Sequence, residues 1–136
     1  MNAAKVDRTQ ICDGQQARTR LRHAMLYMQV AEVALSEESA EHATVATGNA
    51  VLAGIAAADA ICCAVSGARY RGLDHRRAAD HLEHVTADKQ LAALLRDLID
   101  LKDAGHYGLR DLSAARAKSA IRKAGRLVDA ARDRVR

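Results

Sequence analysis

The residues best suited to chemistry stand together near position 106. In the run LKDAGHYG, residues 101–108, two glycines flank His106 and Tyr107, and Lys102 precedes His106 by about one helical turn. A histidine carries a proton near neutral pH, a tyrosine donates a hydroxyl hydrogen, and a lysine supplies a fixed positive charge. With Arg110 close behind, the set predicts a catalytic group for phosphodiester cleavage. It is equally compatible with a helix end that contacts a partner.

Basic residues form two further groups. Residues 113–136 carry eight basic and two acidic side chains, a net +6 in a chain whose total formal charge is +4. A second group, in the stretch after the most apolar part of the chain, consists of Arg69, Arg71, Arg76 and Arg77. Clustered arginines are typical of phosphate-binding surfaces, so we predict nucleic-acid or phosphate binding by this second group. An arginine-rich solvated helix face is the alternative.

Other polar patterns predict solvated helix faces. His81 and His84 are three residues apart, but no third ligand stands at a suitable spacing, and Asp97, Asp100 and Asp103 recur at threes beside Arg96. No phosphate-binding glycine loop, dinucleotide-binding motif, zinc-finger spacing or serine-hydrolase elbow is present in the sequence. We therefore expect neither a metal site nor a cofactor.

The element that must position these groups is the apolar stretch 43–65. Asp59 is its only formally charged residue, and alanine, glycine and other small or apolar residues make up nearly all the rest. A helix that is apolar all round belongs at the centre of a bundle. Because a buried carboxylate is costly without a partner, we expect Asp59 to pair with a basic side chain of the last helix or to lie at an interface.

Helical periodicity predicts the elements around this centre. The first helix is expected over 16–35, a short helix from about Asp74, a longer one capped by Thr86 and Asp88 and ending near 105–108, and a last one capped by Ser113. Ser39 and Thr44 are alternative caps for the central helix. The sequence predicts an all-α, antiparallel four-helix bundle with an additional short helix, in a single domain over 16–136 after a flexible segment, 1–15, lying loosely on the surface.

The amino-acid composition indicates the fold class and the cellular compartment. The 136 residues include no proline, only 2% aromatic residues and three cysteines, at 12, 62 and 63. This composition disfavours strands. We interpret Cys62 and Cys63 as small buried side chains in a reducing compartment, and the N-terminus lacks the apolar core of a signal peptide. Asp59 makes 43–65 a poor membrane span, so we expect a cytoplasmic protein without a membrane partner.

Two stretches together resemble the HEPN domain family. One is GIAAADAICCAVSGARYRGLDHRRAADHL, residues 54–82, and the other is LKDAGHYGLRDLSAARAKSAIRKAGRLVDAA, residues 101–131. Both look like this family of compact helical bundles, in which an alanine-rich helix and a short polar signature before a last, Ser/Thr-capped helix are common features. The resemblance covers about two-thirds of the chain and implies a homodimer with a cleft between the protomers.

Many members of that family are metal-independent ribonucleases of toxin–antitoxin or defence systems, whereas others bind nucleotides or protein partners. Their ribonuclease motif has an arginine and a histidine separated by four to six intervening residues, which before His106 are the positions of Ile99, Asp100 and Leu101. Here Lys102 and Asp103 match the basic and asparagine positions, His106 stands where an aspartate is common, and Tyr107 matches the tyrosine. No arginine stands at the required distance before His106.

We therefore expect a HEPN-like protein that contacts RNA or nucleotides, and a possible metal-independent ribonuclease. In that reaction the 2′-hydroxyl would be the nucleophile, His106 the acid or base, and Lys102 or Arg110 the stabiliser of phosphate charge. A cognate antitoxin or an enzyme is the expected protein partner. The alternative is a non-catalytic helical interaction module or regulator.

Overall fold

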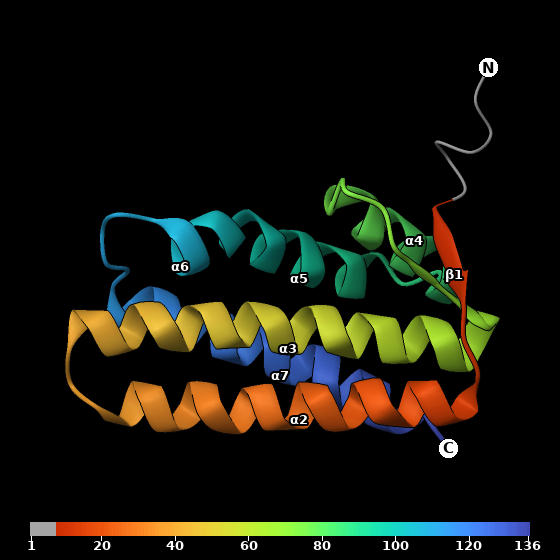
Figure 1. Cartoon of the computed structure of the whole chain (residues 1–136), viewed down its shortest axis with the longest axis horizontal. Helices are drawn as coiled ribbons and strands as arrows, with labels where there is room; N and C mark the ends of the chain where they lie inside the picture. Colours follow the sequence, from red (N-terminus) through yellow and green to blue (C-terminus); the bar gives the residue numbers. More distant parts are fainter. Residues whose placement is uncertain (1–7) are drawn as a thin grey trace.

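The computed structural model describes residues 8–136, and helices dominate it, as predicted (Figure 1). A small antiparallel sheet, which the sequence did not predict, joins β1 to β2. In chain order the elements are β1 (Thr9–Ile11), α2 (Gly14–Ser36), α3 (Ala40–Ser66), β2 (Ala68–Tyr70), α4 (Arg76–Thr86), α5 (Lys89–Asp100), α6 (Lys102–Tyr107) and α7 (Ala114–Arg134).

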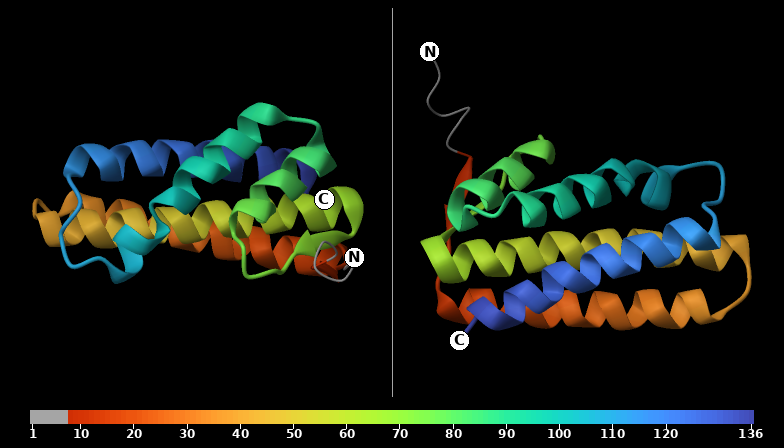
Figure 2. Two further views of the ribbon diagram at one scale, coloured as in Figure 1. Left: turned by 90° about the horizontal axis from the view of Figure 1, so that it is seen from above. Right: turned by 180° about the vertical axis from the view of Figure 1, so that it is seen from behind.

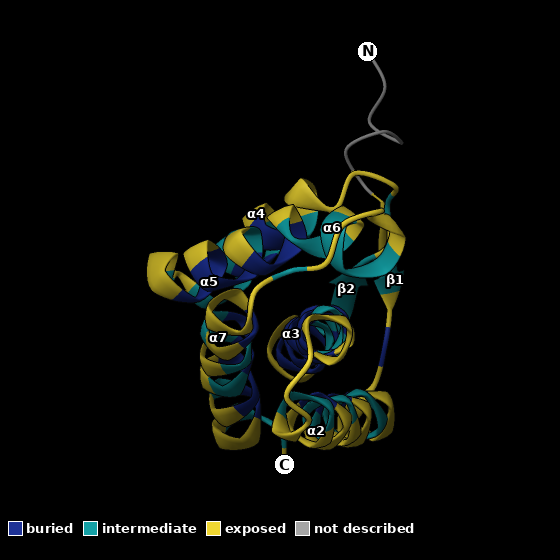
Figure 3. Ribbon diagram, turned by 90° about the vertical axis from the view of Figure 1, so that its left-hand side faces the viewer, coloured by how far each residue is buried: buried dark blue, intermediate teal, exposed yellow. Residues whose placement is uncertain are grey.

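Helix α3 is the centre of the bundle, as its composition predicts. It lies between α2 and α7 on one side and the layer of α4, α5 and α6 on the other (Figure 3). Helix α7 crosses the back of α3 and α2 (Figure 2). Among the described residues, α3 alone is long and apolar enough to cross a membrane by length and composition, yet 67% of its most apolar window is buried inside the bundle.

Side-chain caps fix where the helices begin. The side chains of Ser39, Asp88 and Ser113 accept hydrogen bonds from backbone N–H groups in the first turns of α3, α5 and α7, which confirms these predicted caps. At the other end of α3, Gly67 adopts a left-handed conformation with φ 75°, and its N–H donates to the carbonyl of Cys63. This turn leads directly into β2.

The N-terminal segment departs from the expectation of a loose 1–15. Residues 9–11 form β1, whose Gln10 pairs with Arg69 of β2, and α2 begins at Gly14. Asp13 caps α2 in a reciprocal arrangement with Gln16. Residues 1–7 lie outside the described part of the chain. The expectation is therefore wrong for residues 9–15, because backbone pairing and a capping box hold them.

The cysteines also depart from expectation. Cys12 and Cys63 form a disulfide that ties the start of α2 to the last turn of α3, so the interpretation of Cys63 as a free buried thiol is wrong. Cys62 is a buried free thiol, as expected. Burial, together with the negative charge of Asp59, raises the pKa of Cys62 to about 12.

Candidate anion-binding site

The residues predicted to act as a catalytic group have different partners in the structure. The ammonium of Lys102 lies 2.7 Å from the Nε2 atom of His75, at the start of α4. His106 instead directs its Nε2 atom to the carbonyl oxygen of Gly48 in α3, at 3.0 Å. Tyr107 is 74% exposed, with its ring edge-on to that of His106, and Arg110 is exposed in the following loop. Lys102 and His106 thus bond to different elements, at the start of α4 and in α3.

His106 is held because two glycines let α6 approach α3. A Cβ atom at Gly48 would lie 2.8 Å from the ring carbon Cδ2 of His106 and 3.0 Å from the carbonyl oxygen of Gly105. A Cβ atom at Gly105 would in turn lie 3.1 Å from the backbone of Gly48. The predicted helix over 88–105 divides at Leu101, which allows α6 to turn toward this contact. The hydrogen bond from His106 to Gly48 therefore joins α6 to α3.

Lys102 and His75 form a separate exposed pair. Partial burial and the positive charge of Lys102 lower the pKa of His75, against the opposing effects of Asp74 and Asp103. The ring of His75 is therefore neutral at physiological pH and accepts a hydrogen bond from the Lys102 ammonium.

The four arginines predicted to bind phosphate fall into two sets. Arg76 pairs with Asp100 at 3.2 Å, and Arg77 pairs with Asp74 at 3.7 Å, both on the exposed side of α4. Arg69 and Arg71 lie at the small sheet, where the Nε atom of Arg69 and the NH1 atom of Arg71 both donate to the side-chain oxygen of Gln10, at 3.0 and 3.4 Å. Only Arg69, from this second set, reaches a largely buried charge.

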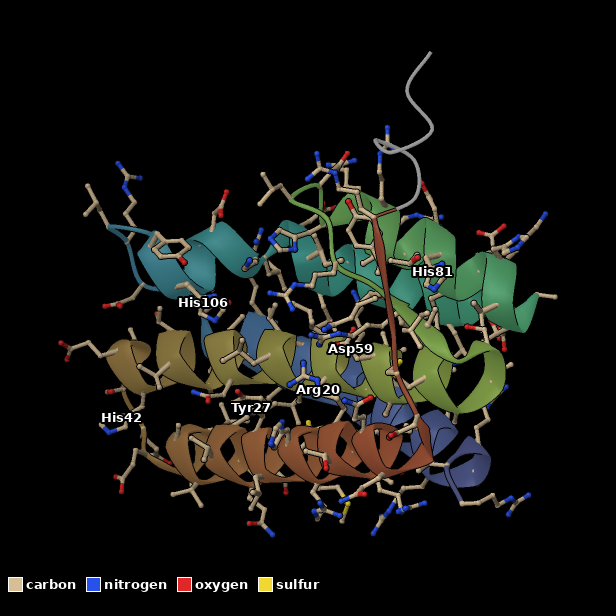
Figure 4. All side chains as sticks on the ribbon, turned by 45° about the vertical axis from the view of Figure 1, so that its right-hand side comes forward. Arg20, Tyr27, His42, Asp59, His81 and His106 are labelled. Carbon is tan, nitrogen blue, oxygen red and sulfur yellow. A yellow bond between two sulfur atoms is a disulfide. The ribbon has the colours of Figure 1, made fainter. Side chains whose placement is uncertain are left out.

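That charge is the carboxylate of Asp59, which both Arg20 of α2 and Arg69 of β2 reach. Its Oδ2 atom accepts hydrogen bonds from Nε of Arg20 in α2, at 3.0 Å, and from NH1 of Arg69 in β2, at 2.9 Å, and it also lies 2.9 Å from the NH2 atom of Arg20. Arg20 and Asp59 lie face to face between α2 and α3 (Figure 4). The expected partner on the last helix is wrong, because the carboxylate pairs with Arg20 of α2 and Arg69 of β2.

The electrostatic balance of this cluster is positive. Burial raises the pKa of Asp59, while the guanidinium groups of Arg20 and Arg69 act in the opposite direction. Even with Asp59 ionised, two positive charges share one negative charge. Each guanidinium carries five N–H donors, of which Asp59, Gln10 and His23 engage only some. The remaining N–H donors of Arg20 and Arg69, together with their excess positive charge, are therefore available to bind an anion.

A cavity of about 190 Å³ opens beside this cluster. We call it the arginine pocket. Its lining comes from β1 and its exit (Gln10, Ile11 and Cys12), from the first turns of α2 (Gln16, Thr19 and Arg20), and from Cys63 and Arg69. Both sulfurs of the disulfide thus belong to residues of its wall. Two guanidinium groups together with amide and hydroxyl donors make the chemistry of an anion site.

Sequence reasoning found Arg69 and Asp59 but missed Arg20 and Gln10. Arg20 is one of three arginines in the first half of α2, and nothing in its spacing marks it out. Gln10 lies in a segment without periodicity.

Among residues 8–136, no group of three or more His, Cys, Asp or Glu side chains is arranged to hold a metal ion. No protein-family model matches this chain, and no curated protein matches it in sequence.

Proposed function

We propose that this protein binds a phosphate-bearing ligand, a nucleotide or an RNA phosphate, in the arginine pocket, and that it does so without catalysis. The observation that carries the proposal is the convergence of Arg20 and Arg69 on a single carboxylate beside an open cavity. Guanidinium groups bind phosphate oxygens through paired hydrogen bonds. Arg71, exposed at the end of β2, adds a further positive charge along the approach.

The test is a titration of the protein with inorganic phosphate, adenosine monophosphate or a short single-stranded RNA, in which calorimetry measures the binding. Arg69→Gln removes one guanidinium and should weaken binding about tenfold. Asp59→Asn removes the competing carboxylate and should strengthen it. Both changes break the ion pair between Asp59 and Arg69. A loss of folded protein would weaken binding in both variants, so it cannot explain opposite effects.

Arg122→Gln is the matched control, because it removes one exposed arginine from α7 on a different part of the molecule. It should leave phosphate binding unchanged and weaken only non-specific attraction of RNA at low salt. Equal affinity of the unmodified protein and Arg69→Gln for all three probes would overturn the proposal. Tighter binding of RNA than of phosphate would identify a polynucleotide as the ligand.

Ribonuclease activity, the function that the HEPN resemblance implies, remains a prediction and has a separate test. In the described structure Lys102 bonds to His75 and His106 to Gly48, so we expect no cleavage of labelled RNA in the presence of EDTA. Cleavage by the unmodified protein that disappears in His106→Ala would establish a metal-independent ribonuclease and overturn the non-catalytic part of the proposal. The thermal stability of His106→Ala must be measured beside it, because His106 also holds α6.

A further inference from the structure

Helix α2 carries a second apolar line on the face turned away from the bundle. Leu26, Val30 and Val33 are 57%, 49% and 70% exposed, whereas Ala17, Ala24 and Ala31 on the opposite face are fully buried; the two sets are offset by about half a helical turn. A surface helix is normally polar on its outer face. Three branched side chains spaced at four and three residues make a continuous apolar ridge.

Charges at the two ends of the ridge have opposite sign. Arg22 precedes Leu26 by four residues within α2 and extends the same line, and Glu37, the C-cap residue, stands at the other end of the helix, four positions after Val33. Within residues 8–136 neither takes part in an ion pair, and Arg22 donates only to the neighbouring hydroxyl of Thr19. Between residues 14 and 41 the other exposed charges follow the same division, with Arg18 before the ridge and Glu32, Glu38 and Glu41 toward its end.

We propose that a second copy of this chain binds here, with the two α2 helices antiparallel about a two-fold axis near residues 29 and 30. This register places Leu26 against the partner's Val33, and Arg22 against the partner's Glu37. The symmetry makes each pair twice. A parallel arrangement would instead set Arg22 beside its own equivalent, and like charges in contact are unfavourable.

The expected dimer is reversible, because a single pair of helices gives an interface at the small end of the range for specific contacts, below about 1,200 Å². The surface differs from the seam around residues 102–107 that the HEPN resemblance implies. It also leaves the arginine pocket's cluster in place, because Arg20 points from α2 toward Asp59 in α3 (Figure 4). The proposal does not rest on the proposed function.

Sedimentation velocity over a concentration series tests the interface. Val30→Glu places two like charges next to the axis and should raise the dimer dissociation constant at least tenfold. Arg122→Gln, which lowers the net charge by the same amount at an exposed position of α7, should leave it unchanged. All of these sites are exposed, and unfolding midpoints should confirm that each variant folds.

A charge-swap experiment tests the antiparallel register. Alone, Arg22→Glu and Glu37→Arg should each be monomeric, because each homodimer would contain two repulsive pairs. Mixed, they should form a heterodimer, because each acid then meets a base. A monomeric unmodified protein at every concentration, a dimer that persists in Val30→Glu, or a mixture that fails to associate would each overturn the proposal.

Discussion

The imidazole Nε2 atom of His106 lies 3.0 Å from the carbonyl oxygen of Gly48, so the ring that the sequence marks for chemistry joins two helices. The contact requires that position 48 has no side chain, because a Cβ atom there would lie 2.8 Å from the ring. Because the carbonyl accepts, the Nε2 atom carries the hydrogen and the neutral tautomer leaves Nδ1 as the acceptor. His106 thus has a structural role in the monomer.

Substitution of Gly48 by alanine should therefore destabilise the protein. The added methyl group must displace the His106 ring and approach the Gly105 carbonyl, a cost of about 1–3 kcal/mol in the free energy of unfolding. Gly125→Ala is the control, because its nearest neighbour, the Cε atom of Met28, is 3.9 Å away and alanine is favoured in helices by about 0.5–1 kcal/mol. Urea denaturation should give opposite signs for the two variants. Equal effects would contradict the close approach of α6 to α3.

Thiol counting tests the disulfide. The native protein without reductant should expose no reactive thiol to an aromatic disulfide reagent, because Cys12 and Cys63 are bonded and burial keeps Cys62 protonated, with its pKa at about 12. Denaturation without reductant should release one thiol, and denaturation with reductant three. Three thiols in the unreduced, denatured protein would show that the bond does not form.

Reduction should also lower stability. The bond closes a loop across a sequence separation of 51 residues, for which loop-closure entropy gives about 4 kcal/mol, an upper value in practice. The midpoint of urea denaturation should therefore fall when a dithiol reductant is present. Cys63→Ala should show the same fall without reductant and no further change when reductant is added.

The helices could be predicted because each has a local cause. Ser39, Asp88 and Ser113 cap their helices through side chains that reach only two or three residues, and apolar spacing identifies the buried faces. The interruption at Leu101 escaped prediction, because it depends on the approach of Gly105 to Gly48, 57 positions earlier in the sequence. Periodicity alone does not detect such a contact.

The arginine pocket could be predicted only in part for the same reason. Asp59 stood out as a charge in an apolar helix, and Arg69 as a member of a cluster. Their partners Arg20 and Gln10 lie 39 residues from Asp59 and 59 residues from Arg69, and only the packing of α2 and the register of β1 bring them together. The disulfide between Cys12 and Cys63 depends on the same packing.

His75 should report its pairing with Lys102 in an NMR titration. In the unmodified protein the pKa of His75 is lowered by partial burial and by the Lys102 charge. Because the lowered pKa favours the neutral ring in the folded state, this group stabilises the fold above its ordinary pKa, and that contribution is lost as the pH falls. Lys102→Met should raise the pKa of His75, whereas Lys123→Met, which breaks the distant pair with Asp97, should leave it unchanged. An unaltered His75 titration in Lys102→Met would contradict the contact.

Asp59 should make anion binding in the arginine pocket depend on pH. Burial raises its pKa, so its carboxyl takes up a proton above the ordinary range of an aspartate as the pH falls. Protonation removes the negative charge that Arg20 and Arg69 share, and the affinity for an anion should rise about tenfold. Sulfate is the suitable probe, because its own charge is constant over this range.

His23 must be separated from this effect, because its ring lies 3.2 Å from Arg20 and its protonation would also add positive charge. Asp59→Asn retains His23 but fixes position 59 as neutral. It should bind sulfate more tightly at pH 7 and should lose most of the increase between pH 7 and 4.5, whereas His23→Gln should keep that increase. If instead Asp59→Asn keeps the increase and His23→Gln loses it, the pH dependence belongs to His23. Sulfate binding that does not change with pH in the unmodified protein would mean that Asp59 stays ionised between its two arginines.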